Sequence, residues 1–556
     1  MNNPTQHWRR IFVIRRRVAG AALALAIMLV SAVLATGSAQ AQTYSESVLH
    51  TFTGPPDGAS PTGSALDAKG NLYGIAGGGD SACDPPYGCG TVFKVDASGT
   101  ETVLYSFTGT GGDGADPFIG LTLDAQGNLY GTTWFGGDLA CNAPEGCGTV
   151  FKFDTTTGNE TVLYSFTGSP ESSKPMGSLV LDAQGNLYGT AHLGGDLACN
   201  AGDGCGTVFE LDTAGVMTVL YSFTGTGGDG ALPGGLVQDA QGNLYGTTAD
   251  GGDLACEAPE GCGTVYKLAP PVAPSVTWTE TTLYSFSGGV DGADPWPGLV
   301  QDKQGNLYGT TSQGGDLACN APNGCGTAFE LDTLGKETAL YSFTGTGGDG
   351  AVPGAGLVRD AKGNLYGTTI AGGDLACNAP DGCGTAFELD TTGKETVLYS
   401  FTGTGGDGAN PFSGLVRDAK GNLYGGTLAG GDLSCTTGPG GDGGTLIGCG
   451  TVFKLTPTKA TKTTTTLTSA PNPSTYGVAV TFTAVVAPVP PDGETISFMR
   501  GKTVLGTGTL SNGTATFVTS TLKVGTTSVT AVYGGDSNFA ASKSKPVKQV
   551  VEKSEE

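Results

Sequence analysis

The stretch GLTLDAQGNLYGTTWFGGDLACNAPEGCGTVFKFDTTTGNETVLYSFTG, residues 120–168, contains four short β-rich runs separated by turns. The runs are GLTLD, NLYGTT, GTVFKFD and TVLYSFTG. AQGN and TTTGNE are typical of turns, because Gly and Asn accept a positive φ. In the third run, Val150 and Lys152 alternate with Phe151 and Phe153, which is the period of a strand. The stretch therefore predicts four antiparallel strands.

This unit occurs seven times. Its marker GNLYG begins at residues 70, 127, 185, 242, 305, 363 and 421, so the spacings are 57, 58, 57, 63, 58 and 58 residues. The one long interval carries an insert, residues 270–278, which we interpret as a surface loop. Seven copies of a four-strand unit are typical of a β-propeller. A solenoid is the alternative, although solenoids usually carry polar caps at both ends.

The two ends of the repeat region favour a ring. The region begins with a lone fourth strand, ESVLHTFTG at residues 46–54, and its last copy stops after a third strand, GTVFKLTP at residues 450–457. Pairing these two strands would remove two exposed sheet edges, which otherwise promote aggregation. We therefore predict an all-β chain in which residues 42–457 form a seven-bladed β-propeller closed by three strands plus one.

The recurring motifs GLVxDAxGNLYGTT, GCGTVFKLD and ETVLYSFTG resemble the GloVer-type tandem repeats of exported bacterial proteins, over about residues 44–457. The strand order is also similar, more loosely, to that of NHL-type propeller blades. The GloVer resemblance implies export and a variable C-terminal attachment. It supplies no established catalytic residues.

The composition changes after Pro457. Residues 458–466 are a Thr- and Lys-rich linker, and residues 467–552 contain short β-rich runs without cysteine. One run, VAVTFTAVV, places five residues on one face: Val478, Val480, Phe482, Ala484 and Val486. Such runs suggest a sandwich. The stretch resembles bacterial Ig-like repeat domains, which implies a spacer or adhesive stalk unit. Residues 553–556 form a charged tail.

The N-terminus reads as a signal peptide over residues 1–41, with five arginines, an apolar run and a small-residue site at Ala39-Gln40-Ala41. An uncleaved anchor is the alternative, since the apolar run is nearly long enough to span a membrane. No other run is a candidate span. We expect a monomer that is secreted or held at the bacterial cell surface. Removing the five arginines lowers the net charge from −24 to −29, which argues against nucleic-acid binding.

Fourteen cysteines in an exported chain predict seven disulfides, and each repeat contributes one local pair. The loops between the cysteines have little apolar content, so we expect them to be ordered by the disulfide, with a contribution of about 2–3 kcal/mol, and not by burial. Zinc bound by the thiolates is a weak alternative, because two further ligands are needed per loop and the mature chain has only His50 and His192. The pairs are Cys83/Cys89, Cys141/Cys147, Cys199/Cys205, Cys256/Cys262, Cys319/Cys325, Cys377/Cys383 and Cys435/Cys449.

In a four-strand meander, the cysteine loops and the crossings between blades emerge on one face. The crossings, such as TGTGGDGADP, repeat an aspartate beside backbone carbonyls, a setting that suits calcium. The alternative is that these aspartates only form turns. No other cofactor is expected. The candidate calcium ligands are Asp113, Asp116, Asp291 and Asp294.

Positions that differ between otherwise similar repeats are candidates for ligand binding, and we expect them on that same face, with Trp134 and Trp296 in exposed loops. They are aromatic or imidazole side chains among acids and amides, which suits sugar rings or a protein ligand. Filling of gaps between blades is the alternative. We predict a non-catalytic recognition or structural protein; the alternative is a glycan-active hydrolase or lyase that uses carboxylates of this face. The candidates are Phe118, Trp134, Phe135, His192, Trp296 and Phe412.

Overall fold

The computed structural model describes residues 44–79, 83, 88–117, 119–168, 170–295, 298–435, 448–458, 461–490, 492–535 and 539–554. The predicted signal peptide lies outside these residues. The all-β prediction is confirmed, because the described chain consists of strands and turns with one 3-10 turn, η1 (Asn200–Gly202). Within those ranges, no helix is long and apolar enough to cross a membrane.

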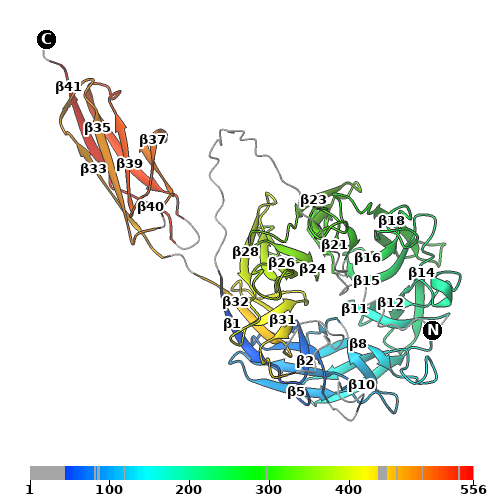
Figure 1. The fold of residues 1–556 in the computed structure, drawn as a ribbon. Coiled ribbons are helices and arrows are strands. Elements are labelled where there is room, and N and C mark those ends of the chain that lie inside the picture. Colours follow the sequence, from blue (N-terminus) through cyan, green and yellow to red (C-terminus); the bar gives the residue numbers. More distant parts are fainter. Residues whose placement is uncertain are drawn as a thin grey trace, which may run out of the picture. The chain divides into compact units, whose positions relative to one another are not determined.

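Seven small antiparallel sheets make up the repeat region, and they follow one another around a common centre (Figure 1). The first four sheets contain β2 (Ala59–Leu66), β3 (Leu72–Gly77), β4 (Thr91–Val95), β5 (Glu101–Ser106); β6 (Gly114–Pro117), β7 (Thr122–Leu123), β8 (Asn128–Gly136), β9 (Thr149–Asp154), β10 (Asn159–Ser165); β11 (Ser173–Leu181), β12 (Leu187–Leu193), β13 (Thr207–Leu211), β14 (Met217–Ser222); β15 (Gly230–Gln238), β16 (Leu244–Gly251), β17 (Thr264–Ala269) and β18 (Thr279–Ser285).

The remaining three sheets follow the same order. They contain β19 (Ala293–Pro295), β20 (Val300–Gln301), β21 (Leu307–Gln313), β22 (Thr327–Leu331), β23 (Glu337–Ser342); β24 (Gly350–Pro353), β25 (Val358–Arg359), β26 (Leu365–Gly372), β27 (Thr385–Leu389), β28 (Glu395–Ser400); β29 (Gly408–Pro411), β30 (Val416–Arg417), β31 (Leu423–Gly430), β32 (Thr451–Pro457) and β1 (Tyr44–Thr51).

The innermost strand of each sheet is less regular than the sequence pattern predicts. In four sheets it is split in two, as in β6 and β7, and in the others its pairing shifts register, as between Met176 and Val180 of β11. The residue before the proline of this strand has a positive φ in every sheet, for example 56° at Asp116. A left-handed residue cannot continue a ladder, so the strand bends there.

The motif GNLYG is explained by two local contacts. Asp124 accepts hydrogen bonds from the backbone N–H groups of Gln126 and Asn128, at 2.9 and 2.8 Å, and thereby closes the first hairpin. A β-carbon on Gly131 would lie 2.6 Å from Cζ of Phe151 on the next strand, so the ring fits only over glycine.

The apolar core lies between neighbouring sheets. At each junction an aromatic ring from the end of one sheet meets, edge to face, a ring from the third strand of the next, with centroids 4.9–5.3 Å apart. The seven pairs are Phe52–Phe93, Phe107–Phe151, Phe166–Phe209, Phe223–Tyr266, Phe286–Phe329, Phe343–Phe387 and Phe401–Phe453.

The predicted pairing between the first and the last strand of the repeat region is present. β1 lies antiparallel to β32, from Tyr44 opposite Pro457 to Thr51 opposite Thr451 (Figure 1). The seventh sheet therefore takes its outer strand from the N-terminal side of the first repeat. Both partners gain backbone hydrogen bonds that an edge strand would lack.

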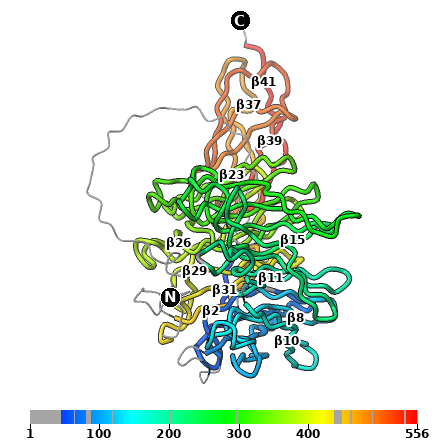
Figure 2. Tube along the Cα trace, turned by 90° about the vertical axis from the view of Figure 1, so that its right-hand side faces the viewer, coloured from blue at the N-terminus to red at the C-terminus, as the bar shows by residue number. Residues whose placement is uncertain are grey.

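The C-terminal region is a separate group of strands with the predicted Ig-like architecture, in which β39 lies beside β41 (Figure 2). Phe482 and Val486 are fully buried between its two sheets, as predicted, but Val478 is 49% exposed because the strand begins only at Val480. The sheets contain β33 (Thr464–Ala470), β35 (Val480–Ala487), β38 (Thr514–Thr519); and β34 (Ser474–Thr475), β41 (Val547–Glu552), β39 (Gly525–Tyr533), β36 (Thr495–Arg500), β37 (Thr503–Thr509) and β40 (Ser542–Lys543).

Deleting residues 43–54 should lower the melting temperature by about 10 °C or more and cause aggregation, because the edge of β32 would be exposed. Differential scanning calorimetry with light scattering measures both effects. The control is deletion of residues 271–277, an exposed stretch of the insert, which should leave melting nearly unchanged. Equal stability of the two variants would contradict a role for β1 in holding the repeat region together.

Candidate functional site: the loop-bearing face

The seven predicted disulfides are confirmed as local pairs, with Cα atoms 5.5–5.7 Å apart. Six of the seven disulfides, all but Cys435–Cys449, lie against a glycine of the crossing that leaves the same sheet. A β-carbon on Gly225, for example, would lie 2.9 Å from Sγ of Cys199 and 3.1 Å from Sγ of Cys205. Cysteine loops and crossings therefore share one face of the repeat region, which we call the loop face.

The expectation that burial does not help to order these loops is wrong for the second cysteine of each pair. This residue is at most 7% exposed in all seven loops, whereas the first cysteine is partly exposed in six of them. The second cysteine directly precedes the third strand, so its side chain turns into the apolar core between two sheets; Cys147, for example, packs with Val150 and Leu187. The buried cysteines are Cys89, Cys147, Cys205, Cys262, Cys325, Cys383 and Cys449.

Each cysteine loop is also joined to the next sheet. The carbonyl oxygen of its second cysteine accepts a hydrogen bond of 2.8–3.1 Å from the left-handed residue that precedes the proline of the next inner strand. The sequence analysis did not identify this recurring position, because the side chains that occupy it in the seven repeats have nothing in common. The seven donors are Ser60, Asp116, Lys174, Leu232, Asp294, Val352 and Asn410.

The predicted calcium ligands divide into two kinds of position. Asp113 organises its crossing: its carboxylate accepts hydrogen bonds from Thr108 N, Thr108 Oγ1 and Tyr105 Oη at 2.7, 2.8 and 3.1 Å. Asp291 makes the equivalent contacts in another crossing. Asp116 and Asp294 instead occupy the left-handed position, where Asp294 accepts a 2.7 Å bond from Ser312. The structure thus shows a turn-forming role for the crossing aspartates, and calcium binding stays a prediction.

A second carboxyl group lies near most of these crossing aspartates. It belongs to a glutamate at the start of the outer strand of the next sheet. Burial, and then the charge of Asp113, raise the pKa of Glu160 to about 7. Burial and the neighbouring crossing aspartate have the same effect on the pKa, to about 7, at Glu46, Glu101, Glu280, Glu337 and Glu395. The sequence shows these acids, but only the packing of adjacent sheets brings them together.

One crossing departs from this pattern in both positions. Glu171 stands where the other crossings have aspartate, and it accepts a 3.0 Å hydrogen bond from Tyr164. Met217 replaces the glutamate of the next outer strand. An apolar side chain therefore stands in place of the second acid, and the carboxyl pair is absent from this junction.

Three candidate ligand-binding residues are buried or half-buried, although an exposed loop is predicted for Trp134. Trp134 lies within β8 rather than in a loop, and it is half-buried. His192 in β12 is 7% exposed, and Phe412 is 5% exposed. The strands of Trp134 and His192, β8 and β12, pack against β11 and β15, the inner strands of the next sheets. Phe118 and Trp296 lie outside the described residues.

The second and third sheets nevertheless bring several of these side chains together. The rings of Trp134 and His192 have centroids 5.7 Å apart. Lys174 Nζ lies 3.5 Å from the centre of the Phe135 ring, so one face of that ring is covered by an ammonium group. Burial lowers the pKa of Lys174 to about 8, although the negative charges of Glu145 and Asp116 act in the opposite direction and raise it. We call Trp134, Phe135, Lys174 and His192 the aromatic–lysine cluster.

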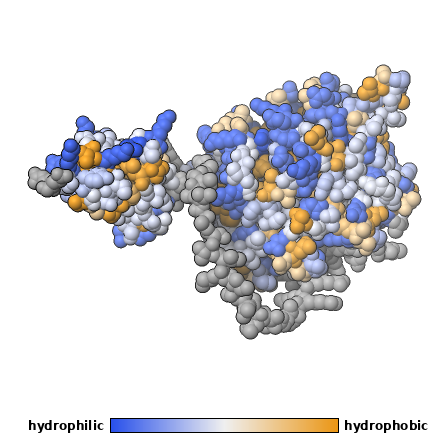
Figure 3. Space-filling model, turned by 90° about the horizontal axis from the view of Figure 1, so that it is seen from above, coloured by the Kyte–Doolittle hydropathy of each residue, from blue (hydrophilic) through white to orange (hydrophobic). Residues whose placement is uncertain are grey.

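The surface of the repeat region in the view of Figure 3 is a mosaic of hydrophilic residues with separate hydrophobic ones. The exposed hydrophobic residues include a leucine that recurs at one position of the cysteine loops, beside the aspartate that precedes each first cysteine. The exposed copies are Leu197, Leu317, Leu375 and Leu433.

The Gloeobacter/Verrucomicrobia repeat model matches residues 37–202 and 198–438, which together are more than half of the chain. The chain belongs to this repeat family. A second family, the bacterial Ig-like domain of group 3, matches residues 467–552 of this repeat-family protein. Both resemblances inferred from the motifs are therefore confirmed. No curated protein matches the sequence.

Solved structures are similar to the repeat-family protein only at low scores. One is the "extracellular domain of the putative one component system" of B. thetaiotaomicron, with 11% identity and a TM-score of 0.43; it covers 93% of this chain, which spans 59% of that chain. Another is an exo-inulinase from Aspergillus awamori, with 11% identity, a TM-score of 0.26 and coverages of 85% and 95%. Scores of this size establish neither a shared activity nor a shared ligand.

Replacing Gly225 by Ala should cost about 2–4 kcal/mol of unfolding free energy, since the added methyl group meets the Cys199–Cys205 disulfide at a positive φ of 63°. Gly227 in the same crossing has a φ of 66°, and no atom lies within 4 Å of the position that a β-carbon would take there. Gly227→Ala is therefore the matched control and should cost only about 1–2 kcal/mol, the backbone contribution. Urea unfolding measures both; equal losses would show that the disulfide does not pack tightly here.

The raised glutamate pKa values predict stability that falls as pH rises. Glutamate in the unfolded chain titrates near 4.3, so between about pH 4.5 and 7 the folded protein binds more protons than the unfolded one. The melting temperature should therefore decrease across this window and level off above it. Glu160→Gln should reduce the decrease, because the amide stays neutral at every pH. The exposed Glu145→Gln is the control; identical pH profiles for both variants would contradict the carboxyl-pair explanation.

Proposed function

We propose that this protein is exported and acts without catalysis, as a recognition protein that binds an extracellular glycan at the aromatic–lysine cluster of its loop face. In this proposal the seven sheets form a closed seven-bladed β-propeller, and the C-terminal Ig-like domain is a spacer. The single observation that carries the proposal is the asymmetry of the cluster. It joins two neighbouring repeats at the junction whose crossing also departs from the other six, with Glu171 and Met217 in place of the Asp–Glu pair.

Ring closure is supported by three contacts at the junction of the seventh and first sheets. β1 pairs with β32, the Phe52 and Phe93 rings meet edge to face, and Ser60 N donates to Cys449 O at 2.8 Å. The last two contacts have equivalents at the other six junctions. A solenoid would not repeat them between its first and last units.

Export is supported by the disulfides. Seven disulfides persist in an oxidising compartment, such as the bacterial periplasm or the cell exterior, and are rare in the cytosol. A formal charge of −24 over the whole chain is consistent with a solvated surface and unfavourable for nucleic acid.

A glycan is the favoured ligand because of the chemistry of the cluster. The half-buried indole of Trp134 offers an apolar face for a sugar ring, whereas the neighbouring Lys174 and His192 are only 3% and 7% exposed and pack within the cluster. Asp116, whose charge acts on Lys174, is exposed at the edge of the cluster. A protein ligand is the second possibility and would use the recurring exposed leucines as well.

The hydrolase or lyase alternative has less support. A catalytic carboxyl pair is needed once, at one cleft, whereas the Asp–Glu pairs of this protein recur at six of the seven sheet junctions. Their aspartates are also occupied by hydrogen bonds within the crossings, as at Asp113 and Asp229. Such regular repetition favours a structural role for these acids.

A glycan-array screen of disulfide-bonded residues 42–556, with and without calcium, tests the proposal. For a glycan that binds, Trp134→Ala should lower the affinity by about 1–2 kcal/mol, roughly tenfold, because a stacking surface is lost. Leu428→Ala, at the equivalent position of the seventh repeat, is the matched control and should keep wild-type affinity. Isothermal titration calorimetry measures both.

Three results would contradict the proposal: no glycan that binds, equal affinities of the two variants, or cleavage of the bound glycan. Mass spectrometry of the incubated glycan detects cleavage and would favour the hydrolase or lyase. If Trp134→Ala lowers the melting temperature by several degrees and leaves binding intact, the side chain fills a gap between sheets instead.

A further inference from the structure

The junction between the seventh and first sheets differs from the other six at one chemically important position. In six repeats the outer strand contains a tyrosine two residues before the phenylalanine that reaches the next sheet; in β1 the corresponding residue is His50. The tyrosines are Tyr105, Tyr164, Tyr221, Tyr284, Tyr341 and Tyr399.

At the six tyrosine junctions this side chain has a simple role. Tyr105, for example, donates its hydroxyl proton to the carboxylate of Asp113 at 3.1 Å, and Tyr221 does the same to Asp229 at 3.2 Å. A neutral tyrosine is a hydrogen-bond donor here and a poor ligand for a divalent ion. Imidazole is among the most common metal ligands in proteins.

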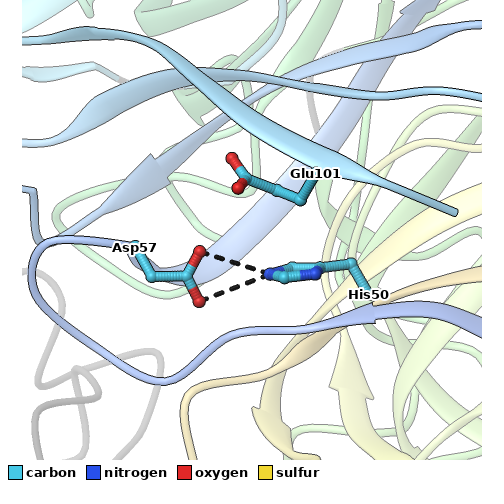
Figure 4. Close-up of side chains that lie close together, drawn as sticks. All are labelled: His50, Asp57 and Glu101. Atoms are coloured by element: carbon cyan, nitrogen blue, oxygen red, sulfur yellow. Dashed lines mark hydrogen bonds and ion pairs between the residues drawn. The ribbon is translucent and has the colours of Figure 1, made fainter.

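His50 is brought together with the two carboxyl groups of its junction. His50 Nε2 lies 3.2 and 3.3 Å from the two carboxylate oxygens of Asp57, and Glu101 of β5 approaches from the first sheet (Figure 4). One potential ligand atom from each residue lies within 4.8 Å of the other two. Within the described ranges this is the only such group of three metal-binding side chains.

We propose that His50, Asp57 and Glu101 bind one divalent transition-metal ion of the zinc type. Zinc takes imidazole nitrogen and carboxylate oxygen at about 2.0–2.2 Å, usually with four ligands, so its ligand atoms lie about 3.4 Å apart. The His50–Asp57 separation already meets this requirement. A carboxylate oxygen of Glu101 comes to this separation by rotation of its side chain, and water takes the fourth ligand position.

The surroundings of the three side chains suit such an ion. Thr53 donates two hydrogen bonds to Asp57 Oδ2, at 2.9 and 3.2 Å, and so orients the carboxylate with Oδ1 toward His50. Glu101 Oε1 is buried and has no hydrogen-bond partner. The side chains of His50 and Asp57 are 23% and 17% exposed, so an ion can reach them from solvent. A zinc-type ion is favoured over calcium, which prefers six to eight oxygen ligands.

The ion would join three segments, of which two are already linked by the side-chain contact between His50 and Asp57. His50 belongs to β1, Asp57 to the crossing that follows it, and Glu101 to the outer strand of the first sheet. Metal binding would therefore strengthen the junction at which the N-terminal strand completes the seventh sheet. This role is independent of glycan binding at the second and third sheets.

Titration of untagged, disulfide-bonded residues 42–556 with zinc chloride after chelator treatment tests the proposal. Calorimetry should show one saturable ion per chain, and excess zinc should raise the melting temperature by about 3 °C. His50→Tyr, which installs the side chain of the other six junctions, should fold normally and lose both effects. Glu101→Gln should weaken binding about tenfold or more. Absence of saturable binding in the wild type, or binding that is unchanged in both variants, overturns the proposal.

The repeat also permits the reverse experiment. Tyr105→His places an imidazole beside Asp113 and Glu160, the same pair of acids at the next junction. This variant should bind two zinc ions per chain. A variant that still binds one ion would overturn the inference that the imidazole at this position creates the site.

Discussion

The hydrogen bond from each inner strand to the preceding cysteine loop is the contact on which the repeat region depends. Its acceptor is the carbonyl oxygen of the second cysteine, and its donor is a residue with a positive φ. In six of the seven repeats the disulfide behind that carbonyl lies against the crossing glycine, as at Gly225, and its second cysteine is buried in all seven. One small covalent ring thus fixes the crossing, the start of the next inner strand and the spacing between two sheets. Apolar burial alone could not do this, because in residues 138–147, for example, Cys147 is the only buried apolar side chain.

Repetition separates structural chemistry from candidate functional chemistry in this chain. Groups that recur at every junction, such as the edge-to-face aromatic pairs and the crossing carboxylates, make the same contacts each time and are explained by folding. Departures from the repeat require another explanation. Three departures are prominent: His50 at a tyrosine position, Lys174 over Phe135, and the change to Glu171 and Met217 at one crossing. Two of them place groups with binding chemistry beside one another.

The paired carboxyl groups show how a regular architecture can accommodate an acidic composition. Each pair is partly buried, so one carboxyl group holds its proton up to a pH near 7 and the repulsion between the two charges is avoided. A cation would achieve the same neutralisation where a suitable third ligand exists. Protonation of a carboxyl group and binding of a metal ion therefore neutralise the acids at equivalent positions of different junctions. The side chain on the preceding outer strand, tyrosine or His50, determines whether the third ligand is present.

The sequence by itself determined the strand pattern, the seven repeats, the local disulfides and the pairing of the first strand with the last. These features follow from period-two alternation, turn residues and cysteine pairs 6 or, in the last repeat, 14 residues apart, all of which are local, and from the missing strand at one end. The sequence did not reveal the left-handed residues before the prolines, the burial of the second cysteine in each loop, the exposure of Val478, the burial of His192 and Phe412, or the approach of Glu101 to His50. These depend on where each strand begins and how adjacent sheets pack. Residues 51 positions apart, such as His50 and Glu101, meet only because the inter-sheet aromatic pairs set that packing.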